Sequence, residues 1–180
     1  MKTISGTGVA LITPFNEDKS IDYNSLDVLI DRSIKKGIDF FVVLGTTGEA
    51  TALNETEKKQ LIQHVLKKNN KRLPVVIGIG GNNTLKIVEE IKKIETVNFD
   101  AILNVTPYYN KPTQEGLYQH YRQISIASKL PIILYNVPSR TGVNMSAELT
   151  IKLANDFDNI CYIKEASGDI NQIKYILENK

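Results

Sequence analysis

The sequence predicts an α/β fold built from repeated βα units, and three observations support this prediction. Short runs of β-branched and other apolar residues alternate along the chain with longer stretches of helical periodicity. Most of the apolar runs have no polar face, which is typical of parallel strands that are covered on both sides. The runs recur about every 30 residues, the length of one strand and its helix. An uninterrupted series of this kind indicates either a doubly wound sheet or a (β/α)8 barrel.

The predicted strands share short length and apolar composition, and they are Gly8–Thr13, Ile38–Leu44, Leu73–Ile79, Asp100–Thr106, Leu130–Tyr135 and Asn159–Lys164. The predicted helices lie between and after them, and they are Asp22–Lys36, Glu55–Lys68, Thr84–Glu95, Gln114–Ser128, Ala147–Ala154 and Ile170–Asn179. Asn54 with Glu57, and Asp169 with Gln172, have the spacing of a capping box at a helix start. No linker or low-complexity tract interrupts the series, so we expect one domain.

The number of βα units bears on the choice of architecture. A (β/α)8 barrel typically needs about 250 residues, whereas the 180 residues here hold six predicted units. If the architecture is a barrel, residues 1–180 form a partial barrel truncated to the first six βα units, with the final two absent. The first and sixth strands would then be open edges. We therefore expect this chain alone to be inactive or poorly soluble.

Composition and charge favour a soluble cytoplasmic protein. The 22 basic and 20 acidic residues are scattered along the chain, so neither a nucleic-acid surface nor a membrane-binding patch is predicted. No apolar run reaches the ~18 residues of a membrane span, and the N-terminus lacks the pattern of a secretory signal. The single cysteine, Cys161, fits a reducing compartment, and its strand position predicts a core residue.

Polar motifs follow the predicted strands at their carboxyl ends, where α/β folds place ligands. After the second strand, Gly45–Glu49 (GTTGE) offers backbone N–H groups and two threonine hydroxyls, although a plain tight turn is an equal alternative. After the fourth strand, Thr106–Pro112 (TPYYNKP) presents two tyrosines between prolines, or packs them as ordinary aromatic residues.

The fifth and sixth strands end in groups suited to carbonyl chemistry. Tyr135 is a phenol at a strand end, and Arg140 follows it with a guanidinium that suits a carboxylate, unless it is a surface arginine in a turn. Lys164 ends an apolar strand, and period-two alternation predicts that Ile160, Tyr162 and Lys164 share one face. Burial of that lysine would lower its pKa and yield a nucleophilic amine, whereas the alternative is a side chain that extends to solvent.

Together these residues resemble the dihydrodipicolinate synthases, which are Schiff-base-forming, pyruvate-dependent aldolases. The resemblance rests on Gly45–Glu49, Thr106–Tyr109, Tyr135–Gly142 (YNVPSRTG) and Lys164–Ala166 (KEA), in the family's order and spacing, and on the opening run Gly8–Phe15. It covers the whole chain and implies a (β/α)8 barrel with a C-terminal helical region that these residues do not include. The GTTGE and lysine elements are shared with N-acetylneuraminate lyase, whereas Arg140 marks the synthase.

The resemblance implies a role for each site residue. Lys164 forms a Schiff base with pyruvate, and the resulting enamine adds to L-aspartate 4-semialdehyde to give 4-hydroxytetrahydrodipicolinate in lysine and diaminopimelate biosynthesis. Tyr135 is the acid and base beside the imine, and Thr46 links it to Tyr109, which reaches in from a neighbouring subunit. Thr47 holds the pyruvate carboxylate and Arg140 receives that of the semialdehyde. No metal or organic cofactor is implied, and the family suggests a homotetramer, a dimer of dimers.

Besides a phosphate-binding barrel, whose customary phosphate site lies after strands 7 and 8, two alternatives remain at this stage. One is another pyruvate-dependent class I aldolase, such as an N-acetylneuraminate lyase-like enzyme, against which Arg140 argues. The other is a non-catalytic, truncated fragment.

Feedback inhibition by lysine is not expected, because Lys58 and Lys86 would place positive charge at the family's effector pocket. A metal site is not expected either, because His64 and His120 lie far apart in the sequence with no further ligand at helical spacing.

Overall fold

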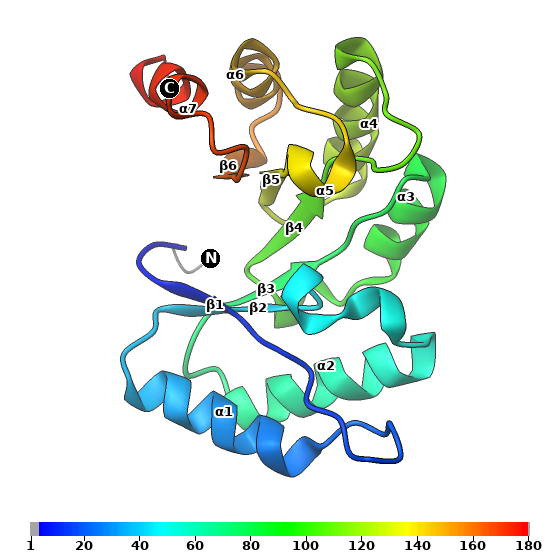
Figure 1. Cartoon of the computed structure of the whole chain (residues 1–180), viewed down its shortest axis with the longest axis vertical. Coiled ribbons are helices and arrows are strands. Elements are labelled where there is room, and N and C mark those ends of the chain that lie inside the picture. The colour runs from blue at the N-terminus through cyan, green and yellow to red at the C-terminus, as the bar shows by residue number, and fades with distance from the viewer. Residues whose placement is uncertain (1–3, 180) are drawn as a thin grey trace. The chain divides into compact units, whose positions relative to one another are not determined.

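The computed structural model describes residues 4–179 and divides the chain into two compact units (Figure 1). The first comprises Met1–Gly78 with Val97–Asp100, and the second comprises Ile79–Thr96 with Ala101–Lys180. Each unit is a succession of parallel strands and helices in chain order. Within the described residues, no helix has both the length and the apolar character needed to cross a membrane.

The first unit holds the first three strands. Strands β1 (Gly8–Ala10), β2 (Phe40–Val43) and β3 (Val75–Gly78) pair in parallel, with Gly8 opposite Phe40 and Phe41 opposite Val75. Helices α1 (Tyr23–Lys35) and α2 (Glu55–Asn69) pack against each other beside these strands (Figure 1). Apolar side chains of the strands and of both helices form the core of this unit, and they include Leu26, Ile30, Phe41, Leu61, Val65 and Val76.

Local capping explains where the helices of this unit begin. The Asn54 side chain accepts the Glu57 N–H at 3.0 Å and the Glu57 carboxylate accepts the Asn54 N–H at 2.8 Å, so the predicted capping box is confirmed. Between β2 and α2 the chain makes two short 3₁₀ turns, η1 (Thr46–Gly48) and η2 (Ala50–Ala52). A third, η3 (Thr96–Asn98), precedes the fourth strand.

The second unit holds β4 (Ala101–Val105), β5 (Ile132–Asn136) and β6 (Ile160–Glu165), which are also parallel and in chain order. Its helices are α3 (Thr84–Lys93), α4 (Gln114–Ala127), α5 (Pro138–Thr141), α6 (Ala147–Asp156) and α7 (Ile170–Glu178). Helix α4 packs on α3 and α6, and α6 packs on α7 (Figure 1). Parallel strands in chain order with successive helices packed side by side are the arrangement of a (β/α)8 barrel, of which the chain carries six βα units.

Strand β6 departs from the predicted alternation. Ile132 pairs with Ile160, but Ile133 pairs with Tyr162, so Cys161 is an extra residue in the strand, a β-bulge. Tyr162 and Lys164 share a face as predicted, whereas Ile160 lies on the opposite face with Ile132, which corrects that part of the prediction. Cys161 is exposed rather than in the core, with its Sγ 3.3 Å from the Asp158 carbonyl oxygen.

The start of α7 also differs in detail from the predicted capping box. Asp169 caps the helix by accepting the N–H groups of Asn171 and Gln172 at 2.9 and 3.2 Å. The reciprocal bond is absent from the described residues, because the Asp169 N–H donates to the Ser167 hydroxyl and the Gln172 side chain turns toward β6. Helix α5, one turn of four residues, was not predicted.

Candidate active site at the carboxyl ends of the strands

Lys164 and Tyr135 meet at the carboxyl ends of β6 and β5. They are partners in the register of the two strands, and paired residues project from the same face of a sheet. The Lys164 Nζ lies 4.2 Å from the centroid of the Tyr135 ring, over its face. The structure therefore brings together the amine and the phenol that the sequence singled out.

The exposure of the two side chains differs. Tyr135 is only 7% exposed, because β5 is buried along its whole length and pairs with β4 on one side and β6 on the other. Lys164 is exposed, so its side chain extends to solvent, which is the second of the two alternatives that the sequence left open, and the burial expected of a nucleophilic lysine is not found. The physical reason is that β6 pairs only with β5 among residues 4–179, so no further strand covers its other side.

Arg140 lies just beyond β5, on the short helix α5. Pro138 begins this helix, a position that suits its fixed φ and missing N–H group. The turn ends at Gly142, whose φ of 74° is in the left-handed region that favours glycine. The Arg140 side chain is exposed, so it is available to an anionic ligand.

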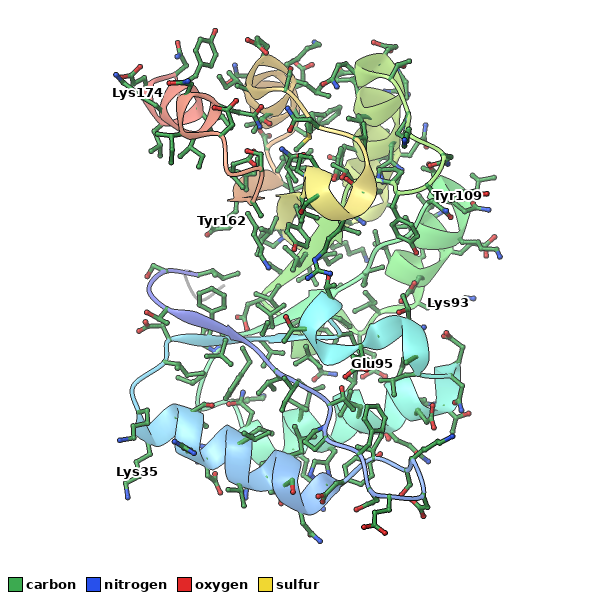
Figure 2. The ribbon with its side chains drawn as sticks, viewed as in Figure 1. Lys35, Lys93, Glu95, Tyr109, Tyr162 and Lys174 are labelled. Atoms are coloured by element: carbon green, nitrogen blue, oxygen red, sulfur yellow. The ribbon has the colours of Figure 1, made fainter. Side chains whose placement is uncertain are left out.

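Tyr109 lies in the loop after β4 and is 88% exposed (Figure 2). The backbone is held in an unusual shape here, with φ of 73° at Tyr109 and 45° at Lys111. Two hydrogen bonds to the loop after β3 support it, from Asn82 Nδ2 to the Tyr108 carbonyl at 3.2 Å and from Asn110 Nδ2 to the Asn82 carbonyl at 3.1 Å. Tyr109 is thus presented outward, away from its own unit's core.

Thr46 and Thr47 belong to the first unit, where they form the turn η1 after β2. Both side chains are exposed. The Thr13 hydroxyl donates to the Gly48 carbonyl at 2.7 Å and holds this turn against the segment after β1. The motif is therefore a tight turn that presents two hydroxyls. The relay predicted through Thr46 joins residues of both units and stays a prediction.

Two residues next to the site were not singled out from the sequence. Asn136 follows Tyr135, and Glu165 follows Lys164; their side chains are hydrogen bonded to each other at 3.0 and 3.2 Å. Asn136 is fully buried. A polar residue directly at the end of an otherwise apolar strand is the signal that could have drawn attention to it.

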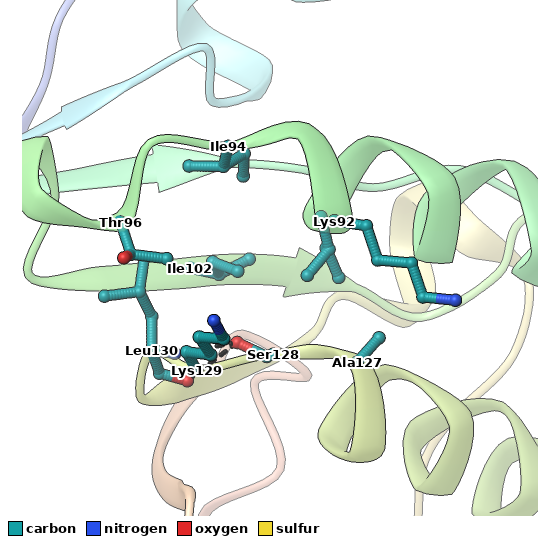
Figure 3. A pocket seen from close by; sticks show the side chains of 9 residues that line it. Lys92, Ile94, Thr96, Ile102, Ala127, Ser128, Lys129 and Leu130 are labelled. Atoms are coloured by element: carbon teal, nitrogen blue, oxygen red, sulfur yellow. Dashed lines mark hydrogen bonds between the residues drawn. The ribbon is translucent and has the colours of Figure 1, made fainter.

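Within residues 4–179, no group of three histidine, cysteine or acidic side chains is placed to hold a metal ion. A cavity of about 290 Å³ lies in the second unit at the amino ends of β4 and β5 (Figure 3). Its lining is mostly aliphatic, with Lys92 and Lys129 at the surface, and it lies at the opposite end of the strands from Tyr135 and Lys164.

Comparison with known proteins places the chain among relatives of known name. It is 54% identical to the 4-hydroxy-tetrahydrodipicolinate synthase of Parabacteroides distasonis over 177 residues, which are 98% of this chain and 60% of that protein. It is 47% identical to the enzyme of the same name from Bacillus subtilis over 168 residues, 93% of this chain and 58% of that one. The chain thus spans about 60% of the length of the curated relatives it matches.

Solved structures of dihydrodipicolinate synthases are also similar to this chain. A dihydrodipicolinate synthase from Acinetobacter baumannii, described as chloride inhibited and in complex with pyruvate, matches with a TM-score of 0.93 and 45% identity, over 98% of this chain and 60% of that one. The dihydrodipicolinate synthase of Aquifex aeolicus matches with a TM-score of 0.91 and 40% identity, over the same shares. The model of the dihydrodipicolinate synthetase family matches residues 3–180. The chain therefore belongs to the dihydrodipicolinate synthetase family.

Proposed function

We propose that the protein condenses pyruvate with L-aspartate 4-semialdehyde through a Schiff base on Lys164 and releases 4-hydroxytetrahydrodipicolinate. The observation that carries the proposal is the pairing of Lys164 with Tyr135, with the amine nitrogen 4.2 Å from the ring centroid. Membership of the family supports it. A relative's structure holds pyruvate, the substrate with which the imine would form.

The chemistry begins with the Lys164 amine. Its nitrogen attacks the ketone carbon of pyruvate, and loss of water gives an imine. The imine withdraws electrons, so a proton leaves the methyl carbon and an enamine forms. That carbon attacks the aldehyde of the semialdehyde and makes the new C–C bond. The amino group of the semialdehyde then displaces Lys164 as the ring closes, which regenerates the free amine; the net balance is one water released.

The other residues would move protons and hold carboxylates. Tyr135 is next to the nitrogen and would deliver the proton that lets water depart, then remove one from the methyl carbon. Thr46 and a Tyr109 from a neighbouring subunit would pass protons between this site and solvent. Thr47 would bind the pyruvate carboxylate, and Arg140 would bind that of the semialdehyde. The exposure of Tyr109 supports proton transfer to a neighbouring subunit, and that of Arg140 supports binding of a carboxylate. We propose that the protein works as a homotetramer in the cytoplasm.

Trapping with borohydride tests the imine directly. Pyruvate plus reductant should leave a stable pyruvate-derived adduct on Lys164, which peptide mass spectrometry locates. The experiment is run on residues 1–180 and on the same chain extended by the C-terminal part of the Parabacteroides distasonis enzyme. Lys164→Ala should abolish the adduct, whereas Lys174→Ala, which removes an exposed lysine of α7, should retain it. An extended, folded protein whose Lys164 stays unmodified would refute the proposal.

A comparison of aldehydes tests the second substrate. The extended protein should condense pyruvate with aspartate semialdehyde and not with N-acetylmannosamine. Arg140→Ala should raise KM for the semialdehyde with little effect on pyruvate trapping, because the arginine would bind only the second substrate. Turnover with the sugar aldehyde alone would instead identify a lyase of the wider superfamily.

A further inference from the structure

The pairing of Lys164 with Tyr135 depends on the bulge in β6. Before the bulge, Ile132 pairs with Ile160; after it, Ile133 pairs with Tyr162 and Tyr135 pairs with Lys164. Had the first register continued, Ile163 would lie beside Tyr135, and Lys164 would lie beside Asn136. Because side chains alternate between faces, a slip of one residue moves a side chain to the other face of the sheet. The position of the lysine therefore requires something that holds the second register.

A hydrogen-bond network lies at that place, one residue beyond the pair. Asn136 and Glu165 are partners in the second register, and they project from the face opposite to Tyr135 and Lys164. The Asn136 amide nitrogen donates to both carboxylate oxygens of Glu165, at 3.2 and 3.0 Å. This is a bond between side chains of neighbouring strands, and it forms here between two residues that are opposite each other, so it favours this register.

Each of the two side chains is also held by its own surroundings. The Glu165 carboxylate accepts the Ser167 N–H at 2.7 Å and the Gln172 amide nitrogen, on α7, at 2.8 Å. The Asn136 amide oxygen accepts the Met145 N–H at 3.0 Å. The network thus connects the ends of β5 and β6 to the segments that begin α6 and α7. Every partner of the carboxylate is a donor, so a group that also donates does not fit there.

We propose that Glu165 and Asn136 are positioning residues, which fix β6 in the register that places the Lys164 nitrogen over the Tyr135 ring. This inference rests on the proposed function of Lys164 as the nucleophile. The bulge at Cys161 moves the lysine into line with the tyrosine, and the network at the last residues of β5 and β6 keeps it there. Bulges are common next to active sites because they re-aim a side chain in this way.

The test is Glu165→Gln, which keeps the volume and replaces one acceptor oxygen by a donor. The rate at which pyruvate plus borohydride labels Lys164 should fall 10- to 100-fold, because a small displacement of a nucleophile costs about that much. Gln172→Glu should have a similar effect, because it sets two carboxylates against each other. The double variant Glu165→Gln/Gln172→Glu restores a donor facing an acceptor between positions 165 and 172 and should recover part of the rate, while the contact of Asn136 with the new amide nitrogen stays unfavourable. Recovery of the labelling rate in the double variant is a result that a general loss of stability would not produce.

A matched control lies at the other end of β6. Asn159, just before β6, accepts a hydrogen bond from the Ser125 hydroxyl at 2.6 Å and donates to the carbonyl oxygens of Ser125 and Ser128 at 3.0 and 3.1 Å. It lies before the bulge, at the opposite end of the strand from Lys164. Asn159→Ala should lower the unfolding temperature and leave the labelling rate within about two-fold of the parent. Circular dichroism tests whether each variant is folded. If Glu165→Gln is unfolded, Gln172→Ala, which removes one donor to the Glu165 carboxylate, is measured in its place.

The outcomes separate this inference from the proposed function. Labelling of the parent at Lys164 together with unchanged labelling in folded Glu165→Gln overturns the positioning role and leaves the function intact. Equal losses in Asn159→Ala and Glu165→Gln, with no recovery in the double variant, also overturn it. Absence of labelling in the extended parent is instead a failure of the proposed function.

Discussion

The Lys164 nitrogen contacts the face of the Tyr135 ring, 4.2 Å from its centroid. Ring and hydroxyl can therefore have separate tasks. The electron-rich face attracts a cation and aligns the lysine chain, whereas the hydroxyl, at the ring's edge, can serve a substrate bound to the nitrogen. Substitutions that remove only the hydroxyl of Tyr135, or the whole aromatic ring, distinguish the two tasks.

Tyr135→Phe keeps the ring and should keep the alignment of Lys164. We expect an unfolding temperature close to that of the parent and a rate of pyruvate labelling about 10²-fold lower, the usual contribution of a general acid. Tyr135→Leu removes the aromatic face as well and should be slower still. Trapping rates and thermal melts of both variants measure this. Equal rates in the parent and Tyr135→Phe would show that the phenol takes no part in forming the imine.

Comparison of sequence and structure shows which features depend on local signals. The helix starting at Glu55 was predictable because Asn54 and Glu57 satisfy each other's backbone groups within one turn. The bulge was not, since an extra residue at Cys161 leaves the apolar composition of the strand unchanged and alters only its pairing. The sequence left two alternatives for the Lys164 side chain, burial or exposure, and the choice between them depends on which strands flank β6. Residue identities thus indicated the chemistry, and long-range pairing determined the geometry.

His120 is a buried histidine of α4 that does not belong to the site. It is 4% exposed, and its Nδ1 lies 2.8 Å from the Thr84 hydroxyl oxygen on α3. Its Nε2 is buried and has no hydrogen-bond partner among the described residues. Burial disfavours the charged form and lowers the pKa of His120 from 6.5 to about 4. The folded protein therefore holds this ring neutral.

This shift predicts a loss of stability in mild acid. Between pH 6.5 and pH 4 the unfolded chain binds a proton at His120 that the folded chain does not, so the free energy of unfolding falls as the pH is lowered. The loss amounts to about 3 kcal/mol at most, at 1.36 kcal/mol per pKa unit. His120→Gln removes this titration. Urea unfolding at several pH values should therefore show a steeper decline for the parent than for the variant, and parallel curves would contradict the assignment.

Gly78, the last residue of β3, is close to the backbone of the neighbouring strand's end. A Cβ placed there would lie 2.3 Å from the Leu44 carbonyl oxygen, which cannot move without disturbing the turn that carries Thr46. Gly78→Ala should therefore lower the free energy of unfolding by about 1–3 kcal/mol, as overpacking does. At Gly45 the nearest side-chain atom would be 3.5 Å away, so Gly45→Ala is the matched control. Denaturant titration compares the two, and equal stabilities would exclude the predicted clash.

Helix α7 predicts how residues 1–180 behave on their own. One side of this helix is packed through Ile176, whereas Ile170 and Leu177, on the same stripe as the half-buried Ile173, are 71% and 68% exposed. Contiguous exposed apolar surface promotes association. Light scattering should therefore show a mass that rises with concentration, and Ile170→Lys/Leu177→Lys should reduce that rise. Val28→Lys, at an equally exposed valine of α1, adds the same kind of charge elsewhere. If it reduces association as much as the α7 variant, net charge rather than the apolar stripe governs the effect.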